Sequence, residues 1–127
     1  MTFFIFLVKY LVFNIISSKI NSYLFKNYYN KILSVLGNDL KNKSITLFGW
    51  SFKKDTNDTR ESASIYIAIA LLQKGAKIKV FDPQTSLEII HRDIKEYSTN
   101  HSSIIDNITC FEDPYEAALD SSCVGIL

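Results

Sequence analysis

Glycine and proline are scarce in this chain of 127 residues, which contains four glycines and two prolines. Disordered, collagen-like and linker-like sequences are rich in these residues, so their scarcity excludes those classes. Cysteine is also scarce. Cys110 and Cys123 are too few for a disulfide scaffold, and they come too late in the chain for a paired metal site. Both glycine-rich phosphate motifs, G-x-G-x-x-G and G-x-x-x-x-G-K-[ST], are absent.

The chain has almost no net charge, with a formal value of +1 at neutral pH. This balance excludes a strongly basic nucleic-acid binder and an acidic tail, so we expect no nucleic-acid partner. The charge is nevertheless uneven along the sequence. Residues 1–50 carry six lysines and one acidic residue, whereas residues 51–127 carry eight basic and twelve acidic residues. Because the lysines are scattered, they form no basic patch.

Hydrophobic residues make up 47% of the chain, which is enough to build one buried core. The length allows one domain and is too short for two ordinary ones. An enzyme that needs a cofactor domain and a substrate domain is therefore not complete in these 127 residues.

The first eighteen residues, MTFFIFLVKYLVFNIISS, have the composition of a membrane segment. The run is interrupted by Lys9 and Asn14, and it is shorter than the roughly 20 residues that a spanning helix needs. It also has no positively charged start and no clear cleavage site of the kind seen in signal peptides. Three interpretations stay open: a membrane or secretory segment, a buried helix, or sequence that does not belong to the domain.

The middle of the chain reads as helix, strand, helix, strand. An apolar stripe at three- and four-residue steps predicts a helix over Asn21–Leu40. A β-rich run ends at Gly49, and an alternating run ends at Asp82-Pro83. Between them the pattern predicts a second helix that stops at Gly75. The expected elements are strands 44–48 and 77–81 around a helix at 60–74, which form one βαβ unit.

The later part of the chain predicts a continuation of the same sheet. We expect a helix at 86–97, a polar loop at 98–107, a strand at 108–111 and a short helix at 114–119. Residues 124–127 read as a strand that begins as the sequence ends. Parallel strands joined by helices predict an α/β fold, a Rossmann-like three-layer domain with a truncated parallel sheet, preceded by a long helix.

The loop between the first strand and its helix is the candidate ligand site. In open α/β sheets, ligands bind beyond the carboxyl ends of the strands. The first turn of a helix offers free N–H groups that suit phosphate, and Lys53, Lys54 and Arg60 add positive charge there. The alternative is a solvated charged loop without a ligand. Spacing alone leaves both interpretations open.

Residues 49–62 read GWSFKKDTNDTRES and resemble the G-x-x-F-K-x-x-T-x-D-x-R-x-S signature of the UDP-glucose/GDP-mannose dehydrogenase family. Within that family the likeness is greatest to animal-type UDP-glucose 6-dehydrogenases. It continues through Gly75-Ala76, Phe81-Asp82-Pro83 and the run Asp113–Ala117. Upstream, Asn21-Ser22-Tyr23 resembles the Asn-x-Tyr with which the family begins a helix leading into this domain. The resemblance covers residues 20–127.

The resemblance implies a division of the chain into three parts. Residues 1–19 are an apolar segment outside the family match, and residues 20–42 resemble the end of a central dimerisation region. Residues 43–127 resemble the UDP-binding C-terminal domain, incomplete at its end. By motif position, Phe52 and Lys53 correspond to residues that contact the UDP-sugar. Arg60 corresponds to the arginine that reaches NAD bound to another domain.

The resemblance also implies a reaction, the oxidation of UDP-glucose to UDP-glucuronate by two NAD⁺ with a covalent thiol intermediate. The main NAD domain and the catalytic cysteine motif are missing, and Cys110 and Cys123 do not match that motif. We therefore expect no catalytic residue, no metal site and no turnover from this chain alone. UDP-glucose and subunits of the same family are the expected partners, in the cytoplasm. The alternative is a non-catalytic interaction module, tethered to a membrane by residues 1–19, that pairs with full-length subunits.

Overall fold

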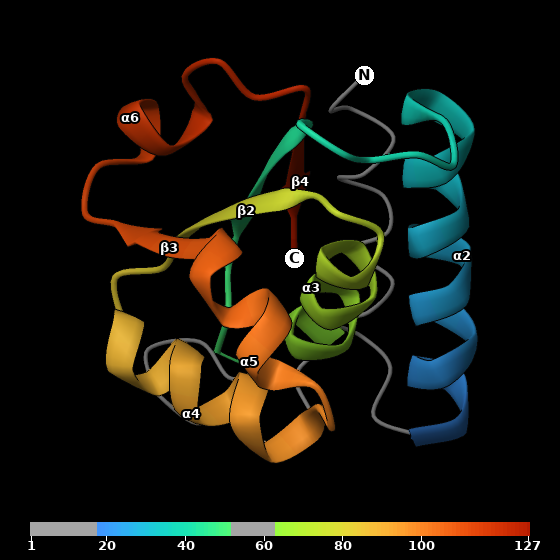
Figure 1. Ribbon diagram of the computed structural model, residues 1–127, viewed down its shortest axis with the longest axis horizontal. Coiled ribbons are helices and arrows are strands. Elements are labelled where there is room, and N and C mark those ends of the chain that lie inside the picture. Colours follow the sequence, from blue (N-terminus) through green and yellow to red (C-terminus); the bar gives the residue numbers. More distant parts are fainter. Residues whose placement is uncertain (1–17, 52–62) are drawn as a thin grey trace.

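Four short runs rich in β-branched and aromatic residues form one parallel sheet (Figure 1). The computed structural model describes residues 18–51 and 63–127, and all structural statements below concern these residues. The strands are β1 (Ser44–Phe48), β2 (Lys77–Phe81), β3 (Ile108–Phe111) and β4 (Cys123–Ile126). Their order across the sheet is β3-β2-β1-β4, and every neighbouring pair is parallel.

The strand order reverses at β1. From β1 the chain moves outward to β2 and β3, and it then crosses back to place β4 on the free side of β1. The register is continuous, since Leu47 lies opposite Val80 on one side and Gly125 on the other. This arrangement is that of a doubly wound Rossmann-like sheet.

Helices cover both faces of the sheet and complete three layers (Figure 1). One face carries α3 (Ala63–Gln73), α4 (Leu87–Tyr97) and α5 (His101–Ile104), followed by a 3₁₀ turn at Ile105–Asn107, and α2 (Ser18–Leu36) lies beside α3. The other face carries α6 (Pro114–Ala118). Thr46 Oγ1 of the sheet donates to the Ala117 carbonyl of α6, and Lys79 Nζ donates to the carbonyl of Leu119, the residue after the helix, at 2.6 Å.

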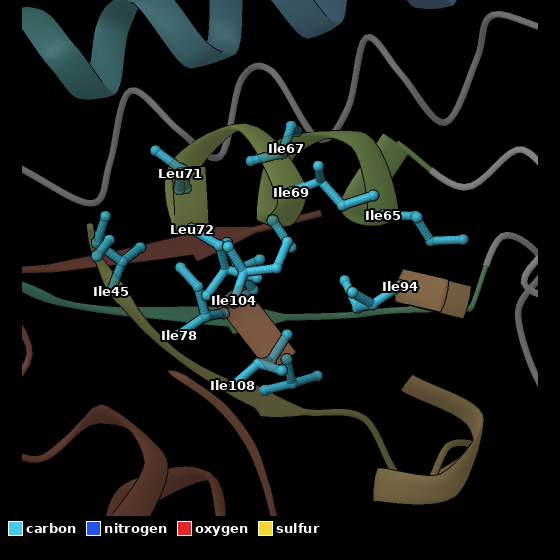
Figure 2. Packing of buried hydrophobic residues seen from close by; sticks show 14 of the residues in the cluster. Ile45, Ile65, Ile67, Ile69, Leu71, Leu72, Ile78, Ile94, Ile104 and Ile108 are labelled. Atoms are coloured by element: carbon cyan, nitrogen blue, oxygen red, sulfur yellow. The ribbon is translucent and has the colours of Figure 1, made fainter. Parts of the chain in front are cut away.

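The core lies between the sheet and the α3 face. Figure 2 shows side chains from α3 converging with Ile45 and Ile78 of the sheet, and with Ile94 and Ile104 from the helices that follow β2. α3 is apolar around most of its surface because it is enclosed by the sheet, α2, α4 and α5. Each of these fully buried aliphatic side chains contributes about 1.5–3 kcal/mol to folding.

α2 joins this core through Tyr28 and Ile32, which are both buried. Gly125 of β4 has no side chain, and this leaves the room that the Tyr28 hydroxyl occupies, because a Cβ there would lie 2.0 Å from that oxygen. The lead-in helix is therefore packed into the α/β domain. In the described part of the chain, no helix is both long enough and apolar enough to cross a membrane.

The structure confirms the α/β class, the βαβ unit and the strands predicted at 44–48, 77–81 and 108–111. The first helix ends at Leu36, earlier than the predicted Leu40, and the last strand begins at Cys123, one residue before the prediction. The predicted polar loop at 98–107 is wrong, since α5 and the 3₁₀ turn lie there. The cause is Ile104, which is buried in the core and anchors this polar stretch. The interpretations of residues 1–17 lie outside the described residues.

Candidate functional site

The carboxyl edge of the sheet at β1 and β4 is the candidate site. In a doubly wound sheet, the ligand binds where the strand order reverses, beyond the carboxyl ends of the two strands that flank the reversal. Here those strands are β1 and β4. Residues Gly49–Ser51 follow β1, and Leu127 follows β4 at the same edge.

Gly49 begins the turn after β1 and lies very close to the end of β4. Its backbone has φ +108°, and its N–H donates to the Phe81 carbonyl at 2.9 Å. On the other side, the Leu127 N–H donates to the Phe48 carbonyl at 2.9 Å. A Cβ on Gly49 would lie 2.7 Å from the Leu127 carbonyl oxygen. Only glycine combines this backbone conformation with this close approach.

Asp82, directly after β2, fixes the path of the chain as it leaves β1. Its Oδ2 accepts hydrogen bonds from the backbone N–H groups of Trp50 (2.7 Å) and Ser51 (2.8 Å). Its Oδ1 accepts from the backbone N–H of Gln84 at 2.8 Å. One carboxylate therefore joins the turn after β1 to the turn after β2.

Trp50 is fully buried, and its indole N–H donates to Asp93 Oδ2 at 2.9 Å. Asp93 lies on α4 and is 2% exposed. Its Oδ1 accepts from Arg92, from Nη2 at 3.0 Å and from Nε at 3.2 Å. The buried carboxylate is thus compensated by one neutral donor and one cation.

The start of α3 is tied to the same turn. Ser64 Oγ donates to the Gly49 carbonyl at 2.7 Å, so the first turn of the helix lies against the end of β1. Two further hydroxyls at this edge, those of Ser51 and Thr85, are buried and find no hydrogen-bond partner in the part of the chain that the structure describes. The edge therefore combines a helix amino terminus with buried polar groups, which is chemistry suited to an anionic ligand.

The residues predicted to bind ligand, Phe52, Lys53 and Arg60, lie outside the described residues. The structure does describe Ser51 before them and Ala63 after them. The Ser51 N–H donates to Asp82, and Ala63 directly precedes Ser64, whose hydroxyl donates to the Gly49 carbonyl after β1. The positions of these three residues stay predictions.

Sequence reasoning missed the roles of Asp82 and Asp93. Asp82 follows a strand at the carboxyl edge, and this placement alone could have marked it as part of the site. Asp93 lies between Ile90 and Ile94 on the buried stripe of α4. A carboxylate in such a stripe needs a donor, and the tryptophan that follows Gly49 supplies it.

Both cysteines lie on strands and neither is activated. Burial raises the pKa of the Cys110 thiol, and the carboxylates of Asp82 and Glu112 raise it further. Burial also raises the pKa of Cys123. Both thiols are therefore protonated and weakly nucleophilic at neutral pH. Cys123 is buried, whereas Cys110 is only half-buried. Among the described residues, no group of three or more His, Cys, Asp or Glu side chains could hold a metal ion.

Known proteins resemble this chain over the same region. The family model for the UDP-binding domain of the UDP-glucose/GDP-mannose dehydrogenase family matches residues 46–127. UDP-glucose 6-dehydrogenase of Gallus gallus is 38% identical over 98 residues, which cover 76% of this chain and 20% of that protein. UDP-glucose 6-dehydrogenase 4 of Arabidopsis thaliana is 34% identical over 119 residues, which cover 86% of this chain and 25% of that protein.

A solved structure agrees with these matches. The UDP-glucose dehydrogenase of the hyperthermophilic archaeon Pyrobaculum islandicum superposes with a TM-score of 0.63 at 25% identity, covering 85% of this chain and 22% of that one. The chain thus spans about a fifth to a quarter of the length of these proteins. The resemblance of the motif at Gly49–Ser62 is confirmed, and the chain belongs to the UDP-glucose/GDP-mannose dehydrogenase family.

Proposed function

We propose that this chain binds the UDP moiety of UDP-glucose at the carboxyl edge of β1 and β4. The observation that carries the proposal is the coincidence of two features in one segment. The match to a UDP-binding domain spans 46–127, and the strand order of the same segment reverses between β1 and β4, where doubly wound sheets bind nucleotides.

The motif supports specific roles at this edge. We assign Phe52 and Lys53 to contacts with the UDP-sugar, where an ammonium group pairs with a phosphate oxygen. The positive end of the α3 dipole adds a second source of positive potential. Arg60 is assigned to NAD bound to a different domain, because a guanidinium suits a pyrophosphate.

The described turn after β1 does not fit an NAD site of its own. A dinucleotide-binding turn needs a second glycine two residues after the first, so that the pyrophosphate can approach the backbone. Here Gly49 is followed by the buried Trp50 and by Ser51. Nicotinamide chemistry is therefore assigned to a separate domain, and this chain acts as the UDP-binding part of an NAD-dependent dehydrogenase that converts UDP-glucose to UDP-glucuronate.

The remaining features of the proposal follow from the same family. Residues 20–42 are assigned to the dimerisation region, residues 43–127 to the UDP-binding domain, and residues 1–19 lie outside both. Partners of the chain are subunits of the same family, in the cytoplasm. The chain alone has no turnover, since both its thiols are protonated and its sequence has no dinucleotide motif.

Calorimetric titration of the full chain with UDP-glucose, UDP and glucose tests this proposal. We expect saturable binding of both nucleotides and none of glucose. Lys53→Met should weaken UDP-glucose binding by about tenfold, the effect of one charge-assisted contact. The matched control Lys54→Met, the same change one residue later, should leave the affinity within about threefold.

Two results would contradict the proposal in different ways. A folded chain that releases no heat with UDP-glucose or UDP would show that the nucleotide assignment is wrong. Formation of NADH from UDP-glucose and NAD⁺, followed by absorbance, would show that the chain is catalytically complete.

A further inference from the structure

The uneven charge of the sequence becomes two separate charged surfaces in the fold. Residues 112–120, which include α6, carry four acidic residues and no basic one. The turns at 37–43 and 73–77 meet at the amino edge of the sheet, where the Lys77 N–H donates to the Lys43 carbonyl at 2.9 Å. Together these turns carry four lysines and one acidic residue. The sequence alone does not predict this basic patch, because its lysines are scattered and only the fold brings them together.

α6 and the residue after it present two large apolar side chains to solvent. Tyr115 is 84% exposed and Leu119 is 65% exposed. The Leu119 N–H donates to the Tyr115 carbonyl at 3.0 Å, so the two residues are one helical turn apart and lie on the same side. Exposed carboxylates flank them in sequence, and in the described part of the chain none of these carboxylates forms an ion pair. We name this set the acidic surface: Glu112, Tyr115, Glu116, Leu119 and Asp120.

The basic patch also combines charge with an apolar side chain. A Cβ on Gly75 would lie 3.4 Å from the Lys41 Cα, so the turn after α3 packs against the turn after α2. Val35, on the last turn of α2, is 37% exposed beside them. Asp39 is the one acidic residue of these turns, and its Oδ1 accepts the Lys41 N–H at 3.0 Å. We name the exposed members the lysine corner: Val35, Lys41, Lys74 and Lys77.

We infer that the acidic surface of one copy of this chain binds the lysine corner of a second copy. The inference goes beyond the proposed function and does not depend on UDP binding. A second copy is the partner because one polypeptide carries both complementary surfaces, each with unlike charge and exposed apolar side chains. The net charge of +1 leaves little overall repulsion between copies.

The arrangement of the two surfaces makes this contact head to tail. α6 lies on one face of the sheet, whereas α2 and α3, which lead into the lysine corner, lie on the other (Figure 1). Both surfaces belong to one packed domain, so a single copy cannot bring them together. The interface therefore joins two different surfaces and leaves one of each free on a dimer.

Complementary charge reversals of the full chain test the inference by sedimentation equilibrium. Glu112→Lys/Glu116→Lys makes the acidic surface positive, and Lys74→Glu/Lys77→Glu makes the lysine corner negative. Each variant alone should associate at least about tenfold more weakly than the unchanged chain. An equimolar mixture should recover the dimer within about threefold, because the second variant keeps the acidic surface and the first keeps the lysine corner.

Glu88→Lys/Glu96→Lys is the matched control, because it makes the same change of net charge on the exposed side of α4. It should leave the association within about threefold of the unchanged chain. Tyr115→Ser/Leu119→Ser changes no charge and should still weaken the association by about tenfold. Raising the salt concentration from about 0.1 M to 1 M should also weaken it, since the screening length falls from about 10 Å to 3 Å.

Three results would overturn the inference. The first is an unchanged chain that stays monomeric at about 1 mM. The second is a charge reversal on either surface that leaves the association unchanged. The third is an equimolar mixture of the two reversed variants that forms no dimer, whereas its recovery of the dimer would show that both variants are folded and that these two surfaces meet. UDP-glucose binding by a monomeric chain would leave the proposed function intact and refute this inference alone.

Discussion

Gly49→Ala tests the close approach on which the site is built. In the folded chain a methyl group at this position would lie 2.7 Å from the Leu127 carbonyl oxygen, and the backbone would have to keep φ +108°. An L-residue in this region costs about 1–2 kcal/mol. Relieving the contact costs a further 1–3 kcal/mol or so, as in other overpacked positions. We therefore expect a loss of about 2–5 kcal/mol, a large part of the roughly 5–15 kcal/mol that stabilises a domain.

Gly37 supplies a matched control for this substitution. It also has a positive φ, +91°, but no atom lies within 4 Å of a Cβ built there. Gly37→Ala should therefore cost only the backbone contribution of about 1–2 kcal/mol. The difference between the two variants isolates the contact between the end of β1 and the end of β4.

Urea unfolding followed by circular dichroism measures both variants. Gly49→Ala should also weaken UDP-glucose binding, because Gly49 opens the turn that leads to Phe52 and Lys53. If the two variants differ by less than about 0.5 kcal/mol, which is the usual size of a surface substitution, the close approach of β1 and β4 is absent and the description of this edge is wrong.

Two further predictions concern buried polar groups. Asp82→Ala leaves the N–H groups of Trp50 and Ser51 without their acceptor and should cost about 2–4 kcal/mol in urea unfolding, whereas Asp82→Asn should cost about half as much; equal costs would contradict the role of Oδ2. Burial, and secondarily Cys123, raises the pKa of Tyr28 above its ordinary value of about 10. The folded state thus binds this proton more tightly than the unfolded chain does. The contribution of Tyr28 to the free energy of unfolding is therefore complete below pH 10, and it falls above pH 10 by up to about 1.4 kcal/mol per pH unit. Tyr28→Phe should remove that part of the alkaline loss, and an unchanged profile between pH 9 and 11 would contradict the assignment.

The sequence was sufficient for the sheet and insufficient for the contacts that shape the site. Three strands were predicted to the residue because each alternating or β-rich run is bounded by glycine, proline or polar residues, as at Gly49 and Asp82-Pro83. The 98–107 segment was misread because its composition is polar, and only the tertiary burial of Ile104 reveals the helix.

The contact between Trp50 and Asp93 joins residues that are 43 positions apart. No local pattern predicts such a pairing, since it depends on α4 packing beside the end of β1. The acidic residue in the buried stripe of α4 was the available signal, and it indicated that a donor was needed without indicating which one. The family motif predicts a ligand loop more specifically than any physical pattern does, because the loop has a single glycine and its three basic residues are balanced by three acidic ones.

A chemical-shift map of the full chain titrated with UDP shows which edge of the sheet binds the nucleotide. We expect the largest amide shifts at Gly49–Ser51 and Leu127, with the single indole N–H of Trp50 among the groups that move. The amino ends of the same strands, Ser44 and Lys77, should stay in place. Shifts concentrated at the amino ends, or none at saturating UDP, would contradict a UDP site at the carboxyl edge of β1 and β4.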